Sequence, residues 1–256
     1  MTLDKIPVIV IEDISAITRR RLIQKTINFI VPGKQLFLPT LLLLATDQLR
    51  KEKKPTKALL PSAQVILLYR ILKRHEGFDN LPMKKIAARL KYTGAAISKA
   101  ADNLRQHNLC ELKGTKEKFI HFPQPVPELW HHALPLLTNP VIKKVYVDIL
   151  PKNVVLMKSN TSALPEYSEV SESKQQFRAI ERNTYYDLEK KGALLNANPY
   201  EGDYCLEVWK YDPTILVGDA TENTYVYPLS LFLSLKDRRD ERIEQALEKI
   251  ITDHIW

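Results

Sequence analysis

The stretch that decides the fold spans residues 81–122 and reads LPMKKIAARLKYTGAAISKAADNLRQHNLCELKGTKEKFIHF. Its first part predicts a short helix from Pro82 to Leu90, because proline is tolerated in the first turn, where the backbone N–H groups lack a helical partner. Its second part predicts a longer helix from Gly94 to His107, because apolar residues recur there at helical spacing. Both helices end in residues that suit a tight turn.

A third helix precedes this stretch and a hairpin ends it. Residues 62–75 carry apolar residues at i, i+3, i+4 and i+7, with Ser62 as the expected N-cap. Residues 110–113 and 118–122 predict two short strands that flank a turn at Gly114. The order of helix, helix, turn, helix and two-stranded hairpin is that of a winged helix-turn-helix domain. We place this domain at residues 61–124.

The positive charge of the chain is concentrated in its middle. The 256 residues carry 38 basic and 30 acidic side chains, a net charge of +8. Residues 50–125 hold 17 basic and 6 acidic side chains, a net charge of +11, whereas residues 126–256 have a net charge of −5. Such a local basic excess is typical of a module that binds nucleic-acid phosphates. The alternative is a lysine-rich surface that is merely solvated.

Candidate DNA-contacting residues lie on the exposed face of the helix predicted at 94–107, at the corner before it and on the hairpin. Small residues at the helix N-terminus allow entry into the major groove, and hydroxyl and lysine side chains can reach phosphates or base edges. Basic residues of the corner and hairpin contribute affinity rather than sequence discrimination. We expect contacts from Thr93, Ala95, Ser98, Lys99 and Asp102 of the helix, Arg89 and Lys91 of the corner, and Lys113, Lys116 and Lys118 of the hairpin.

Three flanking segments complete an expected α+β fold. Residues 1–49 predict a small α/β segment, in which the β-branched run at 7–11 forms a buried strand. Residues 50–60 predict a basic linker, either a solvated connector or an arm that lies along phosphates. Residues 125–256 predict a mixed α/β accessory or dimerisation domain, with strands expected at 141–150, 176–181, 205–211 and 225–227.

The two helices of the deciding stretch also resemble a known family. Met83-Lys-Lys-Ile-Ala-Ala-Arg-Leu90, followed by Ala96-Ile-Ser-Lys-Ala-Ala-Asp-Asn-Leu-Arg-Gln-His-Asn-Leu109, is similar to the pattern of MarR-type winged-helix regulators. Asn108 replaces the glycine that is usual before the last leucine, and asparagine tolerates the same left-handed conformation. The resemblance covers about 60 residues and implies a DNA-binding winged helix.

Two stretches outside it resemble a second group of proteins. Phe29-Ile-Val-Pro-Gly-Lys-Gln-Leu-Phe-Leu-Pro39 and Pro228-Leu-Ser-Leu-Phe-Leu-Ser-Leu-Lys-Asp, the latter followed by Asp240-Glu-Arg-Ile-Glu-Gln-Ala-Leu247, are similar to relatives of AbiEi-type abortive-infection antitoxins. This resemblance implies a bacterial transcriptional regulator that represses its own operon. We expect it to bind double-stranded DNA as a homodimer, since one module contacts only a half-site. The alternative is an antitoxin-like module whose acidic C-terminal region neutralises a toxin-like protein partner.

Other function classes lack their sequence signatures. No Walker loop, G-x-G-x-x-G or G-x-S-x-G occurs, so we expect neither catalysis nor a cofactor. His107 and Cys110 have a ligand-like spacing, but a buried cysteine is also common between a helix and a strand, so we expect no metal site. Two distant cysteines, Cys110 and Cys205, and the lack of a long apolar run predict a cytoplasmic protein without a membrane span.

Overall fold

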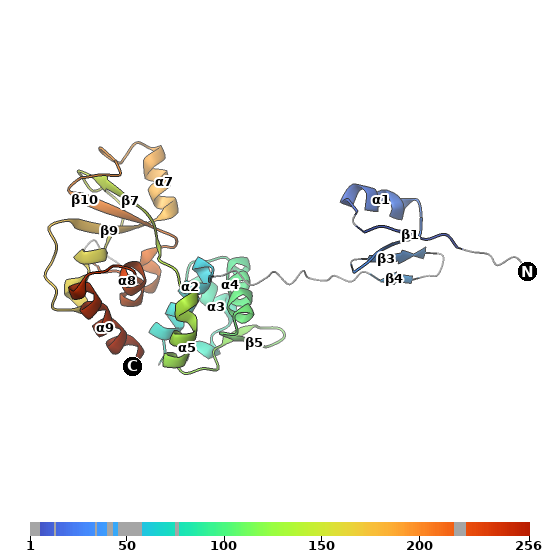
Figure 1. Cartoon of the computed structure of the whole chain (residues 1–256), viewed down its shortest axis with the longest axis horizontal. Coiled ribbons are helices and arrows are strands. Elements are labelled where there is room, and N and C mark those ends of the chain that lie inside the picture. The colour runs from blue at the N-terminus through green and yellow to red at the C-terminus, as the bar shows by residue number, and fades with distance from the viewer. Residues whose placement is uncertain are drawn as a thin grey trace, which may run out of the picture. The chain divides into compact units, whose positions relative to one another are not determined.

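The computed structural model places most of the chain. It describes residues 6–12, 14–33, 35–39, 43–45, 58–74, 77–217 and 224–256. Most of the predicted basic linker, residues 50–57, lies outside the described residues. The chain divides into two compact units, residues 1–54 and 55–256 (Figure 1).

The first unit is a four-stranded sheet with one helix. Its strands follow the chain order β1 (Ile9–Val10), β2 (Phe29–Val31), β3 (Gln35–Leu38) and β4 (Leu43–Ala45). β1 runs parallel to β2, whereas the other neighbours are antiparallel. The helix α1 (Ala16–Gln24) begins after Ser15, whose Oγ accepts a hydrogen bond from the Thr18 backbone N–H at 3.1 Å. This N-cap satisfies one of the N–H groups that a helix start leaves unpaired.

The first unit has an apolar core of its own. The buried apolar side chains described in it are Phe29, Val31 and Leu38. The strand predicted at 7–11 is present as β1, but the prediction that it is buried was wrong, because both of its residues are exposed. The physical reason is position: β1 lies at one end of the sheet and its described partner is β2 alone, so fewer neighbouring side chains surround it than surround a central strand.

The second unit opens with the helices and hairpin that the sequence predicted. They are α2 (Pro61–Leu72), η2 (Phe78–Asn80), α3 (Met83–Arg89), α4 (Gly94–Gln106), β5 (Glu111–Lys113) and β6 (Phe119–His121). Leu60, rather than the predicted Ser62, is the N-cap of α2. Proline at the following position explains the earlier start, because its fixed φ suits the first helical residue. α4 packs against both α2 and α3.

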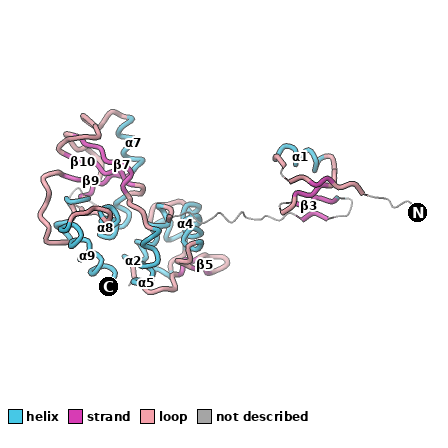
Figure 2. Tube along the Cα trace, viewed as in Figure 1, coloured by secondary structure: helices cyan, strands magenta, loops and turns pink. Residues whose placement is uncertain are grey.

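The remainder of the second unit is built on a mixed sheet. The strand order is β7 (Val141–Val147), β10 (Tyr204–Trp209), β9 (Gln176–Glu181) and β8 (Met157–Lys158). β10 is antiparallel to β7 and parallel to β9. The helices are α5 (Val126–Ala133), η3 (Leu134–Leu136), η4 (Asn160–Ser162), α6 (Leu164–Tyr167), α7 (Arg182–Lys190), η5 (Pro213–Leu216), α8 (Pro228–Leu235) and α9 (Glu241–Ile255). Figure 2 shows these strands gathered together, with helices beside them.

The strand predicted at 225–227 is wrong. Tyr225 forms only an isolated bridge with Lys158, and Tyr227 is already the N-cap of α8. Pro228 begins that helix, which leaves too little extended chain for a strand. The chain is therefore a mixed α+β protein, as predicted, but without the strand expected at 225–227.

One hydrophobic core joins the parts of the second unit. Ile66 of α2 is buried in the same cluster as Trp130 of α5 and Leu247 of α9. The buried Gln64 side chain exchanges two hydrogen bonds with the Thr138 backbone, at 2.9 and 3.0 Å. The two domains predicted within this unit therefore share a core. In the part of the chain that the structure places, no helix combines the length and apolar character needed to cross a bilayer.

Candidate nucleic-acid interface

Helix α4 turns one face into the core and leaves the other free. Ile97 and Leu104 are fully buried on the inner face. Asn103, also buried, ties the helix to the chain before α2, because its Oδ1 accepts a hydrogen bond from the Leu60 backbone N–H at 2.9 Å. These contacts fix the rotation of α4 about its axis. The buried residues therefore determine which residues of α4 face solvent. Sequence reasoning missed Asn103, since a polar residue at this spacing looks like part of the solvated face.

The N-terminal end of α4 is open to solvent. Thr93 is its N-cap, and its Oγ1 accepts a hydrogen bond from the Ala96 backbone N–H at 3.2 Å. Ala95, Ser98 and Lys99 are exposed, as the sequence predicted. No acidic residue lies in the first turn. The positive end of the helix dipole therefore faces solvent beside small side chains, an arrangement that favours an anion.

Asp102 is less available than its neighbours on α4. It is half-buried, and its Oδ1 accepts a hydrogen bond from Arg105 Nη2 at 3.0 Å, an ion pair one turn along the helix. Arg105 thus balances the negative charge of Asp102, which would otherwise repel a nearby phosphate. Of the five helix residues expected at the interface, Asp102 is thus the one whose charge is already matched.

The corner before α4 carries two of the expected residues. Arg89 is exposed, and its Nη1 donates a hydrogen bond to the Tyr69 hydroxyl at 3.2 Å, which orients the guanidinium along α2. Lys91 is exposed in the turn, with a left-handed backbone at φ 53°. Tyr92 anchors the corner: burial first, and then the nearby carboxylates of Asp212 and Glu181, together raise the pKa of its hydroxyl to about 12.

The hairpin presents three exposed lysines. Lys113 Nζ lies 3.4 Å from Glu111 Oε2, whereas Lys116 and Lys118 have no ion pair with any described residue. Gly114 makes the tight turn possible, since its φ is +92° and an added Cβ would collide with the Glu117 carbonyl. The uncommitted lysines thus lie at and after the tip of the hairpin.

Asp79 fastens the hairpin to the helices. Its Oδ1 lies 3.6 Å from Arg70 Nε and accepts a hydrogen bond from the Phe122 backbone N–H at 3.4 Å, while its Oδ2 lies 3.6 Å from His121 Nδ1. The Met83 backbone N–H also donates to the carbonyl of Lys118 at 2.8 Å. These contacts set the direction of the hairpin. Nothing in the sequence signals this role of Asp79 except its rarity as an acid in a basic segment.

The structure brings the helix and the hairpin together. α4 contacts β5, and both lie on the edge of the second unit that faces away from its larger sheet (Figure 1). Exposed small, hydroxyl and lysine side chains therefore occupy one region of the unit. Comparisons of the chain with protein-family models, with curated proteins and with solved structures found no match. The function is accordingly inferred from the residues and contacts described here.

His107 and Cys110, whose spacing resembles that of metal ligands, lie near the end of α4. Cys110 is buried, burial raises the pKa of its thiol to about 12, and its Sγ donates to the carbonyl of Ala101 at 3.8 Å. A protonated thiol is a poor metal ligand. His107 Nε2 is buried without a hydrogen-bond partner among the described residues. The described residues contain no group of three histidine, cysteine or acidic side chains that would hold a metal ion.

A buried carboxylate lies in the larger sheet, away from α4. Glu207 of β10 is fully buried, and its Oε2 accepts a hydrogen bond from Ser159 Oγ at 2.8 Å. Its Oε1 accepts a hydrogen bond from Asn160 Nδ2 at 2.6 Å and lies 3.4 Å from Lys144 Nζ. Arg238 Nη1 donates in turn to Asn160 Oδ1 at 3.0 Å. Both carboxylate oxygens have partners, so this cluster holds η4 and the segment after α8 against the sheet.

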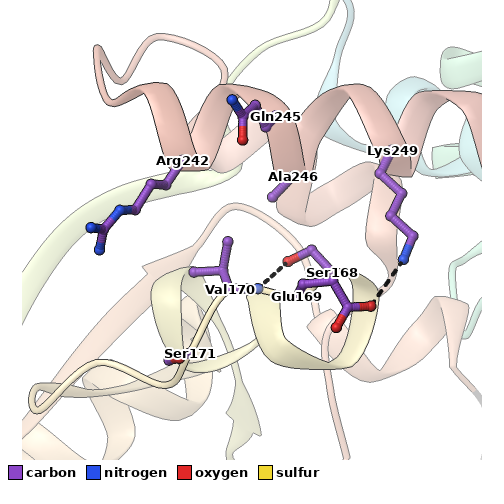
Figure 3. Close-up of a pocket in the computed structure, with 8 residues that line it drawn as sticks. All are labelled: Ser168, Glu169, Val170, Ser171, Arg242, Gln245, Ala246 and Lys249. Atoms are coloured by element: carbon purple, nitrogen blue, oxygen red, sulfur yellow. Dashed lines mark hydrogen bonds and ion pairs between the residues drawn. The ribbon is translucent and has the colours of Figure 1, made fainter.

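A groove of about 490 Å³ lies between α9 and the segment that follows α6 (Figure 3). Lys249 Nζ lies 3.8 Å from Glu169 Oε1 across it, and Ser168 Oγ accepts a hydrogen bond from the Val170 backbone N–H at 3.4 Å. Both signs of charge therefore meet in the groove. None of the ten expected DNA-contacting residues lines it, so it is separate from the candidate interface.

Proposed function

We propose that the chain is a DNA-binding transcriptional regulator whose α4 is the recognition helix of a winged helix-turn-helix domain. The observation that carries this proposal is the exposed N-terminal surface of α4. The side chains of Ala95 and Ser98 are small and do not project far from the helix. Thr93 and Lys99 supply hydrogen-bond donors, and no acidic residue lies in the first turn. An α-helix is about 10–12 Å across, which fits a major groove about 12 Å wide.

The charges around α4 support phosphate contacts on both sides of the groove. Lys91 precedes the helix at the corner, and Lys116 and Lys118 lie on the hairpin, all exposed. Wings of this kind track the backbone or the minor groove, where lysines neutralise phosphates without reading sequence. Arg89 is held by Tyr69 and contributes charge from a fixed position. The net charge of +11 over residues 50–125 provides the long-range attraction.

This mode of DNA binding favours a regulator that acts as a dimer. One module contacts a half-site, so two chains on a twofold site give a complete operator contact. The resemblances in sequence favour repression, with the chain's own operon as the target. Such a regulator acts in the cytoplasm, where bacterial DNA lies. The proposal assigns no catalytic step to the chain.

A second function, neutralisation of a toxin-like protein, is favoured by one observation. Residues 126–256 have a net charge of −5, and Trp256 exposes 78% of its surface at the end of α9. Tryptophan is enriched at the centres of protein interfaces, and an acidic surface attracts a basic partner. The two functions are compatible, since they use different surfaces. Stable co-purification with a basic protein, lost in Trp256→Ala, would support the second.

Binding of the full chain to duplex DNA tests the proposed function. Fluorescence anisotropy compares the DNA upstream of the chain's own gene with a random duplex of equal length. Ala95→Glu places a carboxylate on the exposed start of α4, where a nearby phosphate would be repelled, so affinity should fall at least tenfold. Ala193→Glu, an equally exposed site after α7, is the matched control and should bind as wild type.

Two results would contradict the proposal. One is the absence of any complex with either duplex at low salt, where phosphate contacts are strongest. The other is equal affinity of Ala95→Glu and wild type, which would show that the start of α4 does not approach DNA. Thermal unfolding of both variants checks that the substitutions leave the fold intact, as expected for exposed positions.

A further inference from the structure

The edge strand of the first unit carries an exposed apolar run. Ile6, Val8, Ile9 and Val10 expose 43%, 37%, 45% and 65% of their surface. Side chains alternate along a strand, so both faces of the sheet are apolar at this edge. A single exposed apolar residue is ordinary, but four within five residues mark an interaction surface.

The outer backbone groups of this edge have no hydrogen-bond partner among the described residues. The Ile9 N–H donates to the Asn28 carbonyl at 3.0 Å and the Ile11 N–H to the Ile30 carbonyl at 2.9 Å. Residues 9 and 11 therefore face β2, whereas Val8 and Val10 turn their N–H and C=O groups outward. No described residue pairs with the outer side of β1. Unpaired backbone groups flanked by apolar side chains are a template for a further strand.

The size of the first unit favours association through its sheet. The unit spans 54 residues, and the buried apolar side chains among its described residues are Phe29, Val31 and Leu38. Domains of this size bury a low fraction of their surface and are often stabilised by association. An added strand would cover the exposed valine and isoleucine side chains and pair the free backbone groups together.

We propose that β1 pairs antiparallel with β1 of a second copy of the chain, which joins two four-stranded sheets into one. With the twofold axis beside Ile9, Val8 faces Val10 of the second copy, and both are residues with outward backbone groups. Residues 6–11 contain no charged side chain, so no like charges meet. Each copy presents the same strand, and the contact closes at two chains. A dimer of this kind forms without DNA and goes beyond the proposed DNA binding.

Two outer strands of the second unit suit β1 less well. β5 carries Glu111 and Lys113, and β7 carries Lys143 and Lys144, so either would set charges against apolar side chains. β7 is also covered in part, because Tyr146 exchanges backbone hydrogen bonds with Asn198 at 2.8 and 3.1 Å. Lysines on an edge strand discourage further pairing. The uncharged edge of a second copy is the better match.

The oligomeric state of the full chain in solution tests the proposal. Sedimentation velocity at micromolar concentration should give a dimer for wild type and a monomer for Val10→Lys, because each lysine would then face Val8 of the second copy and set a charge against an apolar edge. Ile23→Lys is the matched control, since Ile23 is 39% exposed but lies on α1, and it should remain a dimer. A monomeric wild type, or a dimeric Val10→Lys, would overturn the proposal. An oligomer of more than two chains, or a complex of one chain with an unrelated protein, would also overturn the proposal, because something other than one second copy would then pair with β1.

A cross-linking variant gives an independent measurement if Val10→Lys fails to fold. Ile9 would form a non-hydrogen-bonded pair with itself, in which Cα atoms lie about 4.5 Å apart, within the range of a disulfide. Ile9→Cys should give a covalent dimer on mild oxidation with oxidised glutathione, and Ile23→Cys should not. The native Cys110 and Cys205 are buried and do not compete. Failure of Ile9→Cys to cross-link, or equal cross-linking of both variants, would overturn the proposal.

Discussion

The electrostatic part of the proposed DNA binding predicts a definite salt dependence. Lys91, Lys99, Lys116 and Lys118 are exposed and have no ion pair among the described residues, whereas Lys113 is matched by Glu111 at 3.4 Å. If each uncommitted lysine neutralises one phosphate, log K falls with log[salt] at a slope of about −3.6 per bound chain. Affinity then decreases about 150-fold from ~50 to ~200 mM salt.

Removal of one of these lysines should change the slope by a known amount. Lys116→Ala should reduce its magnitude by about 0.9 and weaken binding to specific and random duplexes equally, because a phosphate contact carries no sequence information. Lys152→Ala is the control, since Lys152 is exposed in the segment after β7, away from α4 and the hairpin. The assay is anisotropy titration of the full chain at five salt concentrations. A wild-type slope near zero, or equal slopes for the two variants, would refute the reasoning.

Four other perturbations have expected outcomes. Lys99→Ala should lower the preference for specific over random DNA by about 1–3 kcal/mol if the ammonium contacts a base edge; an unchanged affinity ratio places the base contacts elsewhere. Lys91→Gly should stabilise the fold by up to about 1 kcal/mol, since glycine removes the cost of a left-handed φ of 53°, yet weaken DNA binding through the lost charge. Chemical denaturation and anisotropy measure the two effects separately, and a decrease in both would contradict this account of the turn. Glu207→Ala should destabilise the second unit by about 2–4 kcal/mol, because Ser159 and Asn160 each lose a buried partner, and urea unfolding measures the loss. Burial raises the pKa of the Cys110 thiol to about 12, so the folded state retains a proton that the unfolded chain releases above its ordinary value of 9.0. Stability is therefore intact below about pH 9 and falls as the pH rises toward 12, by at most about 1.4 kcal/mol per pH unit for this group. The urea midpoint of wild type should therefore fall between pH 8 and pH 10, and that of Cys110→Ala should fall by less. An equal fall in both proteins would exclude this role for the thiol.

The helices of the second unit could be predicted from sequence because their signals are local. Helix α4 was expected from Gly94 to His107 and runs from Gly94 to Gln106. Its apolar residues recur at helical spacing, and the same spacing identified Ala95, Ser98 and Lys99 as exposed. Local periodicity therefore gave both the element and the free face of the candidate interface.

Features that depend on distant contacts could not be predicted in this way. Asn103 bonds to Leu60 and Asp79 to Phe122, each pair separated by 43 residues, and no spacing rule links them. The run at 7–11 shows the same limit, because β-branched residues look alike in a central strand and in an uncovered edge strand. Glu207 is buried by partners that lie 47 and 48 residues earlier, and no local pattern connects it to them.

The two proposals fall on different units of the chain, which makes their tests independent. The surface proposed to bind DNA belongs to the second unit, whose core extends from α2 to Leu247 of α9. A fragment that ends near residue 125 would leave Ile66 and its neighbours without Trp130 and Leu247, so full-length variants are the appropriate material. The strand proposed to dimerise belongs to the first unit. Val10→Lys should therefore reduce the mass of the protein in solution to one chain and leave the half-site contact of each chain intact, whereas Ala95→Glu should weaken DNA binding at least tenfold in an unchanged dimer. If instead either substitution removes both properties, the two surfaces depend on each other, and the assignment of separate roles to the two units is wrong.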